Sequence, residues 1–99
     1  MKAYLINAES KVIDTIEING MDDIKQQVGY DTIESDSIGD AGDTLFFDEE
    51  CFLRGSAGRF QIDKLIPVSG KGIVVGYAND SFSDVTVSLD ELNSRIKYL

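Results

Sequence analysis

Hydrophobic and polar positions alternate at the start of the chain. The run Lys2–Ile6 is rich in β-forming residues, a polar segment follows at Asn7–Ser10, and a second run at 11–18 again places apolar residues at even spacing. Alternation with a period of two is typical of a half-buried strand. The pattern therefore predicts a β-hairpin in which Tyr4 and Ile6 share one face with the in-phase residues of the second run.

The next segment changes to a helical period. Between Met21 and Val28 the apolar residues recur at intervals of three and four, two aspartates occupy the first turn, and Gly29 follows the last apolar position. Acids near the start of a helix favour its dipole, and glycine is a common stop. We expect a short helix here, followed by a third strand around Asp31–Ile38.

The middle of the chain predicts a second hairpin. Glycine and aspartate at 39–43 favour a turn, and two apolar segments follow, Thr44–Phe47 and Cys51–Leu53, separated by the three acids at 48–50. The simplest arrangement pairs the two apolar segments and places the acids at the hairpin tip.

The last third of the chain predicts a buried strand and a helix. The apolar triplet at 73–75 is typical of a strand covered on both faces. Ser88 and Glu91 have the spacing of a capping box, and apolar residues then follow one helical face over Leu89–Leu99. Together the elements predict a single α+β domain over 1–99, with a mixed or antiparallel sheet of about five strands and two short helices packed on one face.

Composition agrees with one folded, cytoplasmic domain. The chain has 99 residues, 42% of them hydrophobic, which suffices for a core of its own. No apolar run has the length of a membrane helix, and the first residues lack the features of a signal peptide. The single cysteine, Cys51, has no partner for an internal disulfide and lies between Glu50 and Phe52, so we expect a buried structural thiol.

The charge and the missing histidine exclude several function classes. Eighteen acids against nine bases give a net charge of −9, which disfavours direct binding of nucleic acid. The chain has no histidine, the commonest general base and metal ligand, and no carboxylate pair is singled out by its spacing. We therefore expect no enzymatic activity, no cofactor and no metal site.

The acids are concentrated in one half of the chain. Twelve acids and one base lie between Asp14 and Glu50, whereas four bases and one acid lie between Arg54 and Asn79. If the fold gathers these acids on one side, the surface imitates the phosphates of DNA and attracts a basic protein. The alternative is that the acids only keep a small protein soluble. The residues predicted to contact the partner are Asp40, Asp43, Asp48, Glu49 and Glu50.

A different class of function rests on the bases. The stretches Gly55–Gly58 and 70–72 match no phosphate-loop motif, so turn formation explains their glycines. Basic side chains near them could nevertheless collect an anionic metabolite or nucleotide. The residues of this alternative site are Arg54, Arg59, Lys64 and Lys71. The oligomeric state is left open, because an edge strand at Lys2–Ile6 could pair with its counterpart in a dimer.

Several short motifs together resemble a known family. The opening MKAYLI and KVIDTIEI, the central GDTLFFDEECFL, and the closing FQI, SGKGIVVGYAND and SLDELNSRI are similar to the small proteins of domain of unknown function 3846, found in bacteria, phages and plasmids. A departure occurs at Cys51-Phe52, where similar proteins place a glycine and an aliphatic residue. That family carries no established activity, so the resemblance implies no catalytic residues.

The resemblance implies a context in which a small accessory protein of a phage or mobile element binds and modulates a host component. Combined with the acidic residues, it predicts a non-enzymatic modulator or inhibitor of a host nucleic-acid-handling or defence enzyme, acting through a surface that mimics DNA.

Overall fold

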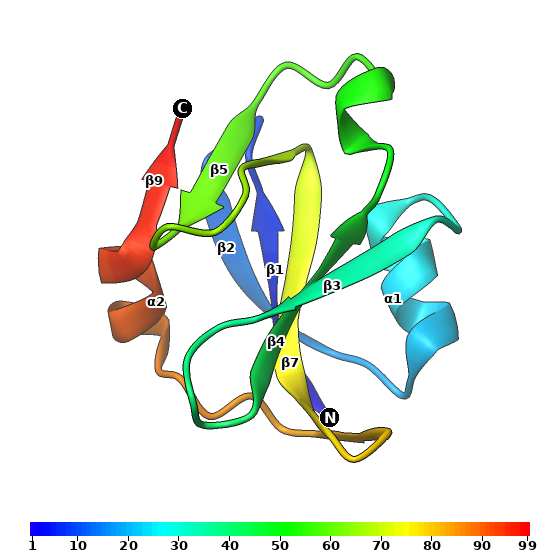
Figure 1. Cartoon of the computed structure of the whole chain (residues 1–99), viewed down its shortest axis with the longest axis vertical. Coiled ribbons are helices and arrows are strands. Elements are labelled where there is room, and N and C mark those ends of the chain that lie inside the picture. The colour runs from blue at the N-terminus through cyan, green and yellow to red at the C-terminus, as the bar shows by residue number, and fades with distance from the viewer.

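The computed structural model describes all residues, 1–99, and arranges them in three layers (Figure 1). A six-stranded antiparallel sheet lies in the middle, with helix α1 (Met21–Val28) on one face and a small three-stranded sheet with helix α2 (Leu89–Arg95) on the other. In spatial order the large sheet contains β2 (Val12–Glu17), β1 (Lys2–Asn7), β7 (Lys71–Ala78), β4 (Asp43–Asp48) and β3 (Ile33–Ser37), with β8 (Ser81–Ser83) paired to the end of β7. The small sheet contains β6 (Val68–Ser69), β5 (Arg59–Ile62) and β9 (Ile96–Tyr98). The predicted α+β class is confirmed.

The N-terminal hairpin forms as predicted, but its faces differ from the expectation. Strands β1 and β2 pair in antiparallel fashion, and the register sets Ala3 opposite Ile16. Because successive residues point to opposite faces of a strand, Tyr4 and Ile6 face the small sheet, while Ile16 and Ile18 pack with Ala3 on the α1 face. The prediction of one shared apolar face is therefore wrong.

Strand β7 is the centre of the large sheet and is buried on both faces, as its apolar triplet predicted. Ile73 and Val75 pack toward α1, and Val74 packs toward the small sheet. Strand β1 lies between β2 and β7, so the open edges are β2 and β3. The expectation of an edge strand at Lys2–Ile6, available for pairing in a dimer, is thus corrected.

The predicted helix and third strand both form. In α1 the side chains of Ile24 and Val28 are buried against β4 and β7. Gly29 adopts a left-handed conformation with φ 96°, and its N–H donates to the Lys25 carbonyl at 2.8 Å, which ends the helix as expected. Strand β3 then runs along one edge of the large sheet.

The hairpin predicted between Thr44–Phe47 and Cys51–Leu53 does not form. Strand β4 is buried on both faces and pairs with β3 on one side and β7 on the other, so both of its edges are taken. The residues Cys51–Leu53 instead form one 3-10 turn, η1, in which Cys51 is 4% exposed and Leu53 is 78% exposed. The thiol of Cys51 is buried, as predicted.

The C-terminal helix begins as predicted and ends early. The Ser88 hydroxyl oxygen accepts a hydrogen bond from the Glu91 N–H at 3.1 Å, which confirms the helix cap. The helix stops at Arg95, because the following residues pair as β9 with β5. Leu92 of α2 packs in the core on the small-sheet side, whereas α1 covers the other face. The two helices therefore lie on opposite faces of the large sheet and not on one (Figure 1).

Candidate functional site

The structure divides the five acids predicted to contact a partner into two groups. Asp43 and Asp48, at the two ends of β4, are each 2% exposed. Asp40, Glu49 and Glu50 are exposed. The expectation that all five belong to one acidic surface is corrected, because the carboxylates of Asp43 and Asp48 are buried and hydrogen-bonded within the protein.

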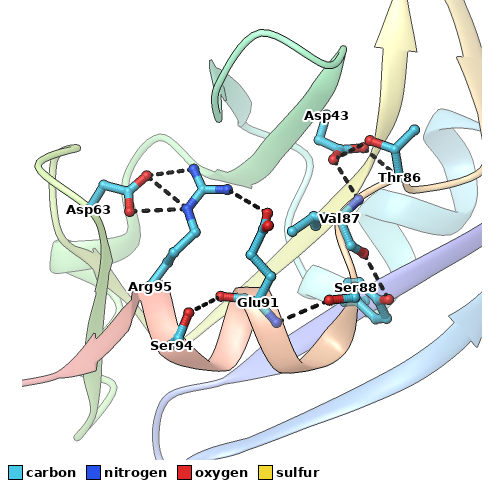
Figure 2. A network of polar contacts seen from close by, with 9 residues as sticks. Asp43, Asp63, Thr86, Val87, Ser88, Glu91, Ser94 and Arg95 are labelled. Carbon is cyan, nitrogen blue, oxygen red and sulfur yellow. Dashed lines mark hydrogen bonds and ion pairs between the residues drawn. The ribbon is translucent and has the colours of Figure 1, made fainter.

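Asp43 fastens the segment that leads into α2. Its carboxylate accepts hydrogen bonds from the Thr86 N–H at 2.8 Å, the Thr86 hydroxyl at 2.7 Å and the Val87 N–H at 2.9 Å (Figure 2). The Val87 carbonyl in turn accepts a bond from the Tyr4 hydroxyl at 2.9 Å. These bonds tie the segment just before α2 to β1 and β4.

Arg95 makes a second fastening at the end of α2. Its guanidinium pairs with Asp63 at 2.5 Å and with Glu91, one helical turn earlier, at 3.5 Å (Figure 2). Hydrogen bonding from Arg95, opposed by partial burial, holds the pKa of Asp63 below its usual value. The carboxylates in Figure 2 therefore position α2, Asp43 from inside the protein and Asp63 and Glu91 from exposed sites.

Asp48 holds the chain where it leaves β4. Its carboxylate accepts bonds from the Thr32 hydroxyl, the Glu50 N–H at 3.1 Å and the Arg54 Nε at 2.9 Å. Burial alone would raise the pKa of Asp48, but these hydrogen bonds outweigh it, and the pKa lies below its usual value. Because Asp48 binds the Glu50 N–H before η1 and the Arg54 side chain after it, this network holds the chain in its turn at η1.

Six carboxylates lie on β3 or beside its ends, and we call this group the acidic edge. Glu34, which is exposed, and Asp36, which is half-buried, belong to β3 and lie on the sheet face that also carries Phe47 and Leu45. Asp40 follows in the turn to β4. At the other end the Glu49 N–H donates to the Thr32 carbonyl at 2.6 Å, which places the residues after β4 beside the start of β3. The acidic edge comprises Asp31, Glu34, Asp36, Asp40, Glu49 and Glu50.

Two cations lie near one end of the acidic edge. Lys25 and Arg54 line an open hollow together with Asp22 and Asp31. Arg54 is already paired with Asp48, so its charge is offset there. The excess of negative charge along β3 is therefore retained.

Of the four bases in the alternative site, the structure brings two together. Arg54 and Lys71 line a cavity of about 280 Å³, which we call the Arg54 cavity. Arg59 lies elsewhere, with its guanidinium 5.0 Å from the centre of the Phe52 ring, and Lys64 is exposed in the turn after β5. The side chains that matter for its chemistry are Glu9, Tyr30, Cys51, Arg54, Ser56 and Lys71.

Sequence reasoning missed the residues that hold Arg54. Its guanidinium stacks over the Tyr30 ring at 4.1 Å, and its Nη2 donates to the Thr32 hydroxyl at 3.2 Å. Tyr30 and Thr32 precede Arg54 by more than twenty residues and form no motif with it. Only the pairing of β3 with β4 brings the two segments together.

Two further observations bear on the kind of site. No group of three or more Cys, Asp and Glu side chains is placed to hold a metal ion. Neither helix is long and apolar enough to cross a membrane.

Comparisons with known proteins found no match for the chain among protein-family models, curated proteins or solved structures.

Proposed function

We propose that this protein is a non-enzymatic modulator that binds a basic surface of a nucleic-acid-handling or defence protein through its acidic edge. The observation that carries the proposal is the placement of six acidic residues on or beside β3, an edge strand of the large sheet. The buried pair, Asp43 and Asp48, is no part of this surface.

The spacing of the charges supports a mimic of nucleic acid. On β3 itself Glu34 and Asp36 are two residues apart, so they lie about 6.6 Å apart on one face of the strand at about 3.3 Å per residue. Asp31 and Asp40 lie before and after the strand, and Glu49 lies beside its start. A basic groove would therefore meet several negative charges within a short distance, as it does along a phosphate backbone.

The open backbone of β3 adds a second means of contact. Strand β3 pairs with β4 on one side only. On its outer side the Ile33 N–H donates to the Asp31 carbonyl at 3.0 Å and the Ser35 N–H donates to the Glu34 carboxylate at 3.4 Å, so an added strand would replace these local bonds. The acids on this edge disfavour pairing with another copy of the same strand, since like charges would face one another. A partner strand or loop rich in lysine and arginine suits this edge.

A group of exposed bases lies apart from the acidic edge, which would orient the protein as it approaches a basic partner. Exposed bases lie on the small-sheet side, with Arg59 on β5, Lys64 in the turn after it and Lys97 on β9. A molecule with separated charges turns its acidic side toward a basic partner before contact, which raises the association rate at low salt. The proposed context, a phage or plasmid accessory protein, rests on the resemblance of short motifs alone, since no family model matches the chain.

A pair of matched charge-reversal variants tests the proposal. The edge variant carries Glu34→Lys and Glu49→Lys, and the control carries Asp14→Lys and Glu17→Lys on β2, the opposite edge of the sheet. Each tagged protein is used at low salt to capture partners from a bacterial lysate, and the affinity of each captured protein is then measured directly over a range of salt concentrations.

The proposal expects a basic nucleic-acid-binding protein that binds wild type and control alike, with an affinity that falls as salt rises. The edge variant should lose that partner while keeping its circular dichroism spectrum. Equal binding by both variants, or no specific partner for the wild type, would contradict the proposal and favour solubility as the only role of the acids.

A further inference from the structure

We propose that the Arg54 cavity binds a small organic oxyanion, a carboxylate or a phosphate monoester, through Arg54, Lys71 and Ser56. The cavity lies between the end of α1, η1 and the start of β7, beside the end of the acidic edge where Asp31 precedes β3. The inference is independent of the protein-binding role proposed above.

Arg54 is held in place before any ligand arrives. Its Nε is bonded to Asp48, its Nη2 to Thr32, and its plane lies over the ring of Tyr30. A guanidinium has five N–H donors in a fixed plane, and the Nη1 atom has no hydrogen-bond partner in the protein. The free donors are thus oriented at little further cost in side-chain entropy, as oxyanion recognition requires.

Lys71 and Ser56 supply the other donors. Lys71 begins β7, where its backbone is fixed by pairing with Asn7 of β1, and its ammonium forms no ion pair. The Ser56 hydroxyl has no hydrogen-bond partner, and it lies close enough to Gly70 that a Cβ built there would be 3.2 Å away. Three side chains from η1 and β7 and the segments beside them therefore line one cavity with unused donors.

The size of the cavity indicates an organic anion. A water molecule occupies about 30 Å³ in the liquid, so a volume near 280 Å³ holds the equivalent of several waters besides an oxyanion group. It lies close to the lower limit of known small-molecule sites. Inorganic phosphate would fill part of it, and a metabolite-sized carboxylate or phosphate monoester would fill more.

The charges around the cavity determine how tightly it binds an anion and which anions it prefers. Asp48 offsets Arg54, and the exposed carboxylate of Glu9 on the cavity wall opposes Lys71, so the site is close to neutral. The neighbouring hollow contains Asp22 and Asp31 and is less suited to an anion. We therefore expect weak binding of simple anions that becomes stronger when Glu9 loses its charge.

The test is an NMR titration of the full chain, following the backbone amides. The probes are inorganic phosphate, succinate and glycerol phosphate, each at constant ionic strength set with sodium chloride. The variants are Lys71→Gln and Glu9→Gln, and the matched control is Lys64→Gln, an exposed lysine outside the cavity. None of these side chains forms an ion pair, so all three variants should fold.

The proposal expects saturable shifts centred on Arg54, Ser56 and Lys71, with an organic probe binding more tightly than inorganic phosphate. Which organic probe binds better distinguishes a carboxylate from a phosphate ligand. Lys71→Gln should weaken binding about tenfold, and Glu9→Gln should strengthen it about threefold, while Lys64→Gln changes nothing. The proposal is overturned by shifts that never saturate, by shifts centred on Arg59, Lys64 and Lys97, or by equal affinities of the Lys71→Gln and Lys64→Gln variants.

Discussion

Replacing Asp43 by alanine should lower the free energy of unfolding strongly. The same replacement of an exposed aspartate in a surface turn would have little effect. The carboxylate is 2% exposed and accepts three hydrogen bonds, two from backbone N–H groups and one from the Thr86 hydroxyl. Alanine leaves all three donors without an acceptor. The Val87 N–H is buried and loses its partner outright, whereas the Thr86 donors are partly exposed and water replaces some of what they lose.

The magnitude follows from the number and burial of these donors. A buried donor left without a partner costs about 1–3 kcal/mol, and hydrogen bonds to a charged acceptor lie in the upper part of that range. One buried and two partly exposed donors give an expected loss of about 3–4 kcal/mol in the free energy of unfolding. For a domain whose total stability is about 5–15 kcal/mol, this is a large fraction.

Urea denaturation followed by far-UV circular dichroism measures the effect, and the midpoint should fall with an unchanged slope. The matched control is Asp40→Ala, which removes an exposed carboxylate three residues earlier and should change stability by less than about 0.5 kcal/mol. If Asp43→Ala lies within about 1 kcal/mol of the wild type, the network in Figure 2 does not fasten α2 as argued.

Two further predictions concern pH and packing. The pKa of Asp48 is lowered in the folded state, so its contribution to stability is present above the unfolded pKa of about 3.9 and is lost as the pH falls through the folded value. Acid unfolding monitored by circular dichroism should show a smaller loss of stability below pH 4 in Asp48→Asn than in the wild type, and an identical acid response would refute this role. Gly72→Ala should cost about 1–3 kcal/mol, because its Cβ would lie 2.7 Å from the Phe60 Cζ and 3.0 Å from the Leu45 Cδ1. Gly20→Ala, where nothing lies within 4 Å, is the control, and equal thermal midpoints for the two variants would contradict the packing argument.

Local patterns were sufficient for the elements whose stabilising contacts are near in sequence. The hairpin of β1 and β2, the helix α1 with its stop at Gly29, and the cap of α2 at Ser88 each follow from side chains within a few residues of one another. The apolar triplet at 73–75 also predicted the central strand β7 correctly, since burial on both faces requires a continuous apolar run. These features need no knowledge of distant partners.

Features that depend on pairing between distant segments were beyond the reach of such patterns. Residues 51–53 have the apolar character of a strand, yet β4 already has β3 and β7 on its two edges, so no edge is left for them. The apolar periodicity of α2 continues past Arg95, which favours a longer helix. Residues 96–98 instead pair with β5 as a strand, and a helix through these residues would lose that pairing.

The acids show the same limit most clearly. The sequence around Asp43 does not distinguish it from Asp40, because its donors come from Thr86 and Val87, more than forty residues later. Asp48 has two donors nearby, the Glu50 N–H and Arg54, but its third, Thr32, is brought to it only by the fold. The amino-acid sequence was enough to establish how much negative charge the protein carries and in which half of the chain. The folded structure decided which carboxylates are buried and hydrogen-bonded within the protein and which stay unpaired on or beside β3, since burial and hydrogen bonding depend on residues brought together by the sheet.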